Sequence, residues 1–255
     1  MRVRQSPTSS LLLFLTLWLG GCASTQEQDF NENVAEANFK LGVGYMQSGH
    51  FQVATEKLLK ALQFKDNYPE AHNAIAVLYE EIREYGSAEN HYKRAIDLKP
   101  DYTLARLNYA RFLCLREPVR TAEGESELQR IVADPVNAGA SASDAYTGLA
   151  QCARQRQDSA QAETWLRKAL EINPNNASAL FEMAQLSQTQ SKTLQARAFL
   201  QRYHSQSRPT LQSLSLGIAI ESAPGGDPLL RRDYRAVLVA QFPNSDEARR
   251  LKQPE

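Results

Sequence analysis

Apolar positions along the chain recur in a helical pattern that repeats at a fixed distance. The segments AENHYKRAIDLKP (88–100) and AETWLRKALEINP (162–174) share alanines, a glutamate, a basic residue, an aliphatic residue and a proline in the same order. A third copy, ATEKLLKALQFKD (54–66), begins 34 residues before the first. Within each copy the apolar residues stand three or four positions apart, which is the spacing of one helix face. The period predicts an array of similar helical units.

The copies resemble the tetratricopeptide repeat, a helix-turn-helix unit of 34 residues. Small residues at positions 8 and 20 let the two helices approach, and larger residues at 7, 11 and 24 fill the space beside them. In the first unit, positions 7, 8 and 11 are Leu41, Gly42 and Tyr45. Proline near position 32 ends the second helix. One unit cannot bury its own apolar face, so neighbouring units must stack.

The resulting fold class is all-α, a tetratricopeptide-repeat solenoid of antiparallel helix pairs with about six repeats and a C-terminal capping helix. The predicted units form one superhelical domain over 35–255 and lie near 35–68, 69–102, 103–142, 143–176, 177–210 and 211–243, with a cap over 244–255. Two of them are inferred from length and context. The third lacks a clean alanine register in its second half, EPVRTAEGESELQRIVADP, and the pattern of the sixth decays after Pro209.

The start of the chain has the features of an export signal. Arg2 and Arg4 precede the stretch 11–19, which is apolar except for Thr16. A membrane-spanning helix needs about 20 apolar residues, so this run is too short to span a membrane. It is typical of the apolar region of a signal peptide. We therefore predict a signal peptide over residues 1–21.

Leu-Gly-Gly-Cys at the end of this segment resembles the bacterial lipobox. The resemblance implies that Cys22 becomes the mature N-terminus and carries lipid, since two or three acyl chains anchor a protein firmly. Residues 22–34 would then form a lipidated flexible tether. Because Ala23 rather than aspartate follows Cys22, the resemblance also implies the periplasmic face of the outer membrane. The alternative is an ordinary secretory signal in which Cys22 is incidental.

Composition and motifs argue against several classes of function. Lys plus Arg and Asp plus Glu both number 29, whereas a nucleic-acid binder needs a basic patch or stripe. The four histidines are scattered, and no metal-binding, phosphate-loop or nucleophile-elbow motif occurs. We therefore predict no enzyme activity, no catalytic residues, no metal, no cofactor and no nucleic-acid partner.

Cys114 and Cys152 are predicted on the first helices of neighbouring units, which lie side by side in such a solenoid. An exported protein meets an oxidising compartment, so a disulfide between them is permitted. Their heights along the two helices differ by about half a turn to a turn, which a bridge must absorb. We expect the disulfide, and two buried free thiols remain the alternative.

A partner-binding groove is expected on the first helices of units one and two. In the repeat family, ligands generally meet positions such as 2, 5, 9, 12 and 13 of the first helix. Positions 5, 9 and 12 hold Phe39, Val43 and Met46 in unit one, and Asn73, Val77 and Glu80 in unit two. An exposed apolar stripe marks a partner site. The alternative is that chain before Ala35 covers the stripe.

A lipobox followed by about six such repeats is similar to the pilotins of type IV pili, the PilF/PilW group. The segment NYARFLC (108–114) is the most distinctive part of that resemblance. It implies that the lipoprotein binds a secretin subunit and accompanies it to the outer membrane, and that the membrane is met through the N-terminal lipid. We expect a monomer. The alternative is an adaptor for another cell-envelope process, such as cell-wall hydrolase recruitment or outer-membrane protein assembly.

Overall fold

The computed structural model describes the backbone of residues 20–251 and the side chains of residues 27–251. The predicted signal peptide therefore lies outside the described residues, apart from the backbone of its last two positions. The backbone of Cys22 is described, but its side chain is not. Among residues 20–251, no helix combines the length and the apolar composition needed to cross a bilayer.

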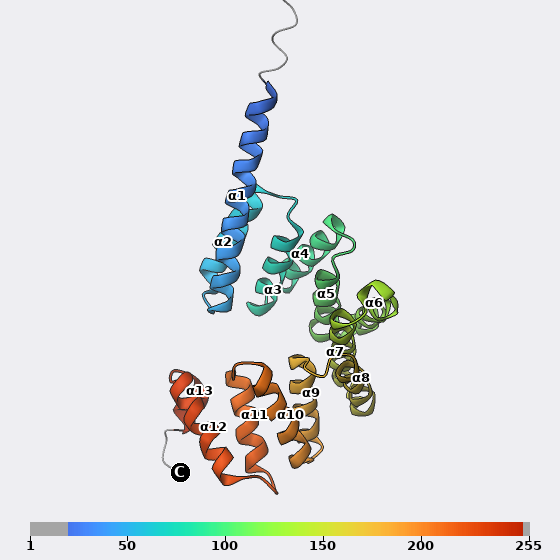
Figure 1. The fold of residues 1–255 in the computed structure, drawn as a ribbon, viewed down its shortest axis with the longest axis vertical. Coiled ribbons are helices and arrows are strands. Elements are labelled where there is room, and N and C mark those ends of the chain that lie inside the picture. Colours follow the sequence, from blue (N-terminus) through green and yellow to red (C-terminus); the bar gives the residue numbers. More distant parts are fainter. Residues whose placement is uncertain (1–19, 252–255) are drawn as a thin grey trace, which may run out of the picture. The chain divides into compact units, whose positions relative to one another are not determined.

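The described residues are almost entirely helical, and they contain no strand (Figure 1). The chain forms two compact units, Met1–Pro100 and Asp101–Glu255. In the first unit the helices are α1 (Gly20–Gln47), α2 (Phe51–Phe64), α3 (Pro69–Glu81) and α4 (Tyr85–Leu98). In the second they are α5 (Thr103–Arg116), α6 (Thr121–Ala133), α7 (Ala140–Gln155), α8 (Ser159–Ile172), α9 (Ala177–Thr189), α10 (Thr193–Gln206), α11 (Leu211–Ser222), α12 (Pro228–Gln241) and α13 (Asp246–Leu251).

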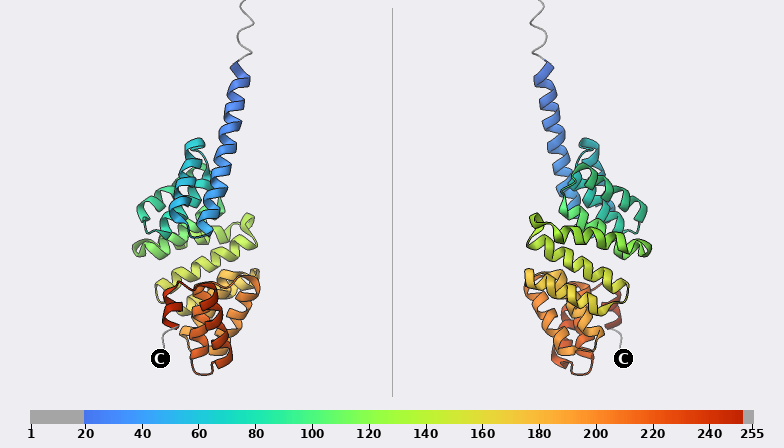
Figure 2. Two further views of the ribbon diagram at one scale, coloured as in Figure 1. Left: turned by 90° about the vertical axis from the view of Figure 1, so that its left-hand side faces the viewer. Right: turned by 90° about the vertical axis from the view of Figure 1, so that its right-hand side faces the viewer.

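Consecutive helices pack in pairs within each unit (Figure 2). The pairs are α1 with α2 and α3 with α4 in the first unit, then α5 with α6, α7 with α8, α9 with α10 and α11 with α12 in the second. The predicted all-α tetratricopeptide architecture is thus confirmed, with six helix pairs and a short last helix in the described part of the chain. One continuous superhelix over 35–255 stays a prediction.

Close approach of paired helices explains why glycine stands at two positions of the pattern. A Cβ added at Gly42 on α1 would lie 2.6 Å from Cγ of Leu58 on α2. A Cβ at Gly124 on α6 would lie 2.5 Å from the carbonyl oxygen of Ala110 on α5. Real Cβ atoms do not approach so closely, so only glycine permits these two contacts.

The segment expected to be a flexible tether is helical in the structure. α1 begins at Gly20 and runs without interruption through residues 22–34 to Gln47. No proline stands in this stretch, and its alanine, glutamine and glutamate residues favour a helix. Lys65, which follows α2, pairs with Glu32 at 3.6 Å and joins this part of α1 to the rest of the unit. The prediction of a flexible tether over residues 22–34 was therefore wrong for the backbone, which is helical; its lipidation stays a prediction.

The two weakly patterned regions also fold as helix pairs. Two short 3-10 segments, Pro118–Arg120 and Pro135–Asn137, flank α6 and accommodate the altered register of the third unit. At the C-terminal end, Ser245 Oγ accepts a hydrogen bond from the Ala248 backbone N–H at 3.1 Å and caps α13. Ala248 is fully buried against α11 and α12. α13 therefore covers the last helix pair.

Candidate partner-binding surfaces

The predicted groove residues of α1 are half-buried rather than freely exposed. Phe39, Val43 and Met46 pack beside a core cluster of α2 and α3 residues. The ring of Phe39 lies 5.1 Å from that of Tyr68, centroid to centroid. The stripe is therefore partly covered, and α2 and α3 provide the cover. The chain before Ala35 continues the same helix instead of folding over the stripe.

The exposed apolar side chains of α1 lie at different positions. Leu41 is 51% exposed, Tyr45 is 37% exposed and Phe30 is 62% exposed. Leu41 and Tyr45 occupy repeat positions 7 and 11, which were expected to be packed. In later repeats, the residue at position 7 is buried because it contacts the second helix of the preceding repeat. Ile75 on α3, for example, packs against α2. No helix pair precedes repeat one in the described part of the chain, so this surface of α1 is uncovered there.

We call this surface the outer face of α1 and define it by Phe30, Leu41 and Tyr45. Sequence reasoning missed it because the repeat pattern assigns positions 7 and 11 to the core in every unit. The signal that could have found it is the place of the unit in the array. A solenoid end needs a polar outer surface, and Leu41 and Tyr45 do not supply one.

The groove residues predicted on α3 are buried or half-buried within the first compact unit. Asn73 is buried and Val77 is half-buried. Glu80 accepts a hydrogen bond from the hydroxyl of Tyr92 on α4 at 3.1 Å. Glu80 therefore contributes to the packing between α3 and α4.

Two histidines pair between α3 and α4, with His72 buried and His91 half-buried. His72 Nε2 lies 3.0 Å from the carbonyl oxygen of Asp66, and the two Nδ1 atoms of His72 and His91 lie 2.8 Å apart. A carbonyl only accepts, so Nε2 of His72 carries the proton. In the neutral pair, Nδ1 of His91 then donates to Nδ1 of His72. Burial lowers the pKa of His72, and burial and its neighbour lower the pKa of His91 to about 4.

We expect the protein to lose stability as the pH falls from 7.5 to 5. Unfolded histidine has a pKa of about 6.5 and binds protons before the buried pair does, so stability is lost below that pH. After allowance for the half-exposed His91, the loss is on the order of 1–2 kcal/mol. Urea unfolding at the two pH values measures it. In a His91→Gln variant the pH dependence should shrink, and an unchanged dependence would contradict this assignment.

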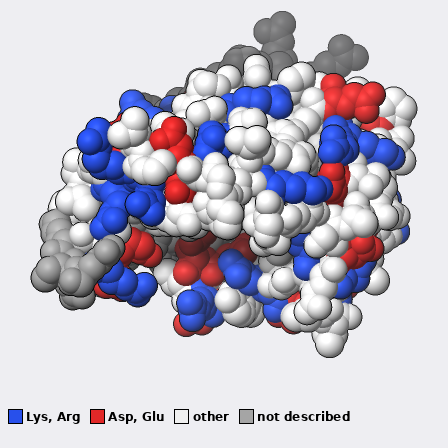
Figure 3. Space-filling model, turned by 90° about the horizontal axis from the view of Figure 1, so that it is seen from below, with Lys and Arg blue, Asp and Glu red and all other residues white. Residues whose placement is uncertain are grey.

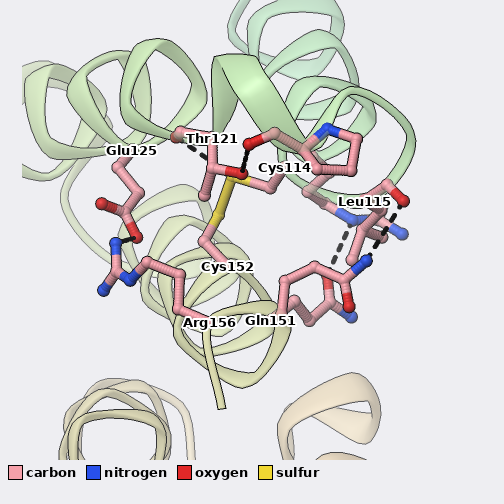
Figure 4. Close-up of a disulfide and its surroundings, with 10 residues drawn as sticks. Cys114, Leu115, Thr121, Glu125, Gln151, Cys152 and Arg156 are labelled. Atoms are coloured by element: carbon pink, nitrogen blue, oxygen red, sulfur yellow. Dashed lines mark hydrogen bonds and ion pairs between the residues drawn. A yellow bond between two sulfur atoms is a disulfide. The ribbon is translucent and has the colours of Figure 1, made fainter. Parts of the chain in front are cut away.

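Cys114 and Cys152 form a disulfide that joins α5 to α7 within the second unit (Figure 4). The S–S distance is 2.04 Å, the Cα atoms are 5.1 Å apart, and both residues are fully buried. An ion pair between Arg156 and Glu125 lies beside the bond. The sequence left open a disulfide or two buried free thiols, and the structure has the disulfide.

The second unit also contains a pocket that sequence reasoning missed. It lies between α5, α7 and α9 and has a volume of about 160 Å³. Its lining includes Leu104, Leu107, Arg111, Thr147, Gln151 and Ser178. These residues stand at positions 2, 5 and 9 of their repeats, the positions used to predict the groove of repeats one and two. The same rule applied to repeats three to five would have found the pocket.

The described residues show neither a metal centre nor a separation of charge on the face in view. No three His, Cys, Asp or Glu side chains among them come together as metal ligands would. On the face seen in Figure 3, basic and acidic side chains are interspersed. This pattern favours a protein partner over nucleic acid.

Comparison with known proteins places the repeats in a family. Residues 69–102 and 143–186 match models of the tetratricopeptide repeat. The type IV pilus assembly protein PilF of Pseudomonas aeruginosa is 28% identical over 220 residues, which cover 83% of this chain and 85% of the relative.

Two solved structures agree with this relationship. The P. aeruginosa pilF structure is 26% identical with a TM-score of 0.57, and the match covers 87% of this chain and 98% of that one. The structure of PilW, a widely conserved type IV pilus biogenesis factor, is 25% identical with a TM-score of 0.63, covering 86% and 99%. This chain is a PilF/PilW-like tetratricopeptide-repeat protein. The PilF/PilW-like relationship extends over both units.

Proposed function

We propose that this PilF/PilW-like chain is a non-enzymatic outer-membrane lipoprotein that binds a secretin subunit and promotes its outer-membrane localisation and multimerisation for type IV pilus assembly. Similarity to type IV pilus assembly proteins over most of the chain supports the process. The lipobox-like sequence before Cys22 supports the anchor. The observation that carries partner binding is the uncovered outer face of α1.

We place the client on the outer face of α1 rather than on the predicted stripe. Phe39, Val43 and Met46 already contact the core of the unit, so little of their surface remains for a partner. Leu41 and Tyr45 stand where a preceding helix would pack, and an amphipathic helix of the client can take that place. Leu41 and Cys22 lie on the same helix, and at a rise of 1.5 Å per residue the distance between them along the helix axis is roughly 29 Å.

A deletion strain complemented with variants tests this proposal. Wild type should restore secretin multimers at the outer membrane. Cys22→Ser should bind secretin in a pull-down but leave it mislocalised. The double variant Leu41→Asp/Tyr45→Asp should reach the outer membrane but lose at least about 10-fold in secretin affinity, which corresponds to about 1.4 kcal/mol.

The matched control is Val136→Asp/Leu194→Asp, which alters two exposed apolar residues of the second unit and should behave as wild type. Full secretin multimerisation in the uncomplemented deletion strain would overturn the function. Retained secretin binding by the α1 double variant would overturn the surface alone. Recovery of a cell-wall hydrolase or an outer-membrane assembly factor in place of secretin would favour an adaptor for another envelope process.

A further inference from the structure

We infer that the C-terminal end of the second compact unit has a docking site of its own, in which an acidic amphipathic helix of a protein partner packs on α12 beside α13. The site is a groove of about 620 Å³ along α12 and the end of α13. We call it the α12 groove, and its lining includes Arg231, Arg232, Arg235, Ala236, Val239 and Leu251. It does not depend on the client of α1, because all its residues belong to the second unit.

The place of α12 in the repeat array explains why part of this helix is uncovered. The helices α6, α8 and α10 each pack against the first helix of the next pair, which has 12 to 16 residues. After α12 the described part of the chain supplies only α13, which has 6 residues against 14 in α12. At 1.5 Å per residue, α13 is about 9 Å long and α12 about 21 Å. Roughly two turns of α12 therefore lie beyond the reach of α13, and a further helix fits there.

The floor of the α12 groove is apolar and contains a small residue. Val239 and Leu251 are half-buried and pack at the edge of the core cluster formed by Leu214, Leu238 and Ala248. Ala236, one turn before Val239 on the same face, is exposed. A small side chain lets a neighbouring helix approach closely. A hollowed apolar floor of this kind fits a helix better than it fits the flat surface of a bilayer.

The rim of the α12 groove is basic. Arg231 and Arg235 stand one turn apart and are half-buried. Arg232 is 76% exposed and lies 3.8 Å from Asp233. Among the described residues, no carboxylate pairs with Arg231 or Arg235, whereas Arg197 in the same unit pairs with a buried glutamate. The charge of the rim is therefore available to a partner.

These arginines stand where they disfavour the helix that carries them. α12 begins at Pro228, so Arg231 lies near the N-terminus, where the helix dipole opposes a positive charge. Arg231 and Arg235 also repel each other, since like charges four residues apart face one another on a helix. Asp227 accepts hydrogen bonds from the first backbone N–H groups of α12 and offsets part of this cost. Carboxylates of a partner would relieve the rest.

The segment around the α12 groove is also basic. Residues 228–251 contain five arginines and three carboxylates, whereas the chain as a whole has equal numbers of basic and acidic residues. Charge complementarity therefore favours an acidic partner. A helix with an apolar stripe and with glutamates or aspartates four residues apart matches both the floor and the rim, because Arg231 and Arg235 have that same spacing.

Fluorescence anisotropy with the full mature protein tests this site. The probes are three matched pools of fluorescein-labelled peptides of about 15 residues, which is long enough to form a helix. Each pool has one face of leucine and alanine. The positions that flank this face are glutamate in the first pool, glutamine in the second and lysine in the third. We expect the glutamate pool to bind at least about five-fold more tightly than the glutamine pool, and the lysine pool to bind most weakly.

Two variants test the rim and the floor separately. Arg231→Glu/Arg235→Glu should reverse the order, so that the lysine pool binds most tightly. Ala236→Tyr keeps the charges but fills the floor, and it should weaken binding of the glutamate pool at least about five-fold. The matched control Lys60→Glu/Arg83→Glu changes the net charge equally at exposed positions of the first unit and should keep the wild-type order. Circular dichroism establishes that the variants are folded.

A glutamate pool that binds no better than the glutamine pool would overturn the inference, and so would an unchanged order in the charge-reversal variant. Phosphatidylglycerol vesicles that bind through the arginines while the glutamate pool does not would assign the rim to a membrane surface instead. Self-association in sedimentation that the charge-reversal variant abolishes would make a second copy the occupant. Secretin binding through α1 is measured separately by pull-down, so failure of this site and failure of the proposed function are distinguishable.

Discussion

Replacing both Cys114 and Cys152 by alanine is expected to lower the free energy of unfolding by about 4 kcal/mol. The bond closes a loop of 38 residues, and a cross-link over a loop of this length restricts the unfolded chain by about that amount. The loss should fall on the second unit, because both cysteines belong to it.

Urea unfolding under non-reducing conditions measures this difference. Wild type treated with reductant provides an independent route to the same state and should lose a similar amount. In the alanine variant, reductant should change nothing further. A loss below about 1 kcal/mol by both routes would contradict the expected contribution of the bond.

The second large effect is expected at Glu221, near the end of α11. Its side chain is 1% exposed. Oε1 accepts a hydrogen bond from Nε of Arg197 at 2.8 Å, and Oε2 accepts from the Asp227 backbone N–H at 2.7 Å. Arg197 also donates to the carbonyl oxygen of Gly225 at 3.2 Å. The pair thus connects α10, α11 and the loop before α12.

Glu221→Ala should lower the free energy of unfolding by about 3–5 kcal/mol, because it leaves the half-buried guanidinium of Arg197 and the Asp227 backbone N–H without their partner. In the wild type, the hydrogen bond to Glu221 raises the pKa of Arg197. A guanidinium does not lose its proton in a protein, so Arg197 stays charged in the variant. Chemical denaturation measures the loss.

Two comparison variants sharpen this experiment. Glu163→Ala removes one partner of a more exposed pair with Arg167 on α8 and should cost less than about 1 kcal/mol. The double variant Arg197→Met/Glu221→Leu should recover much of the stability, because an apolar pair of similar volume often replaces a buried ion pair without loss. A Glu221→Ala loss no larger than that of Glu163→Ala would contradict the buried-pair account.

Sequence reasoning predicted most of the fold because the repeat pattern depends on residues that lie close together in the chain. The small residue at position 8 and the proline that ends the second helix act within about 34 residues. Helix pairing could therefore be predicted from spacing in the four well-patterned repeats, whereas the third and sixth repeats were inferred from length and context. The prediction of a flexible tether was wrong because it relied on the same local pattern. Residues 22–34 show no apolar pattern, and yet they continue α1 as one helix.

The sequence by itself determined the helical class, the repeat length and the lipobox-like segment, since each depends on residues close together in the chain. The tertiary structure alone decided which apolar residues stay uncovered. Leu41 and Ile75 occupy the same repeat position, but among the residues that the structure describes only Ile75 has the helix of a preceding repeat against which to pack. The bridge between Cys114 and Cys152 and the pocket at Arg111 likewise depend on how α5 and α7 meet. Burial depends on neighbours, and residues distant in the chain supply those neighbours.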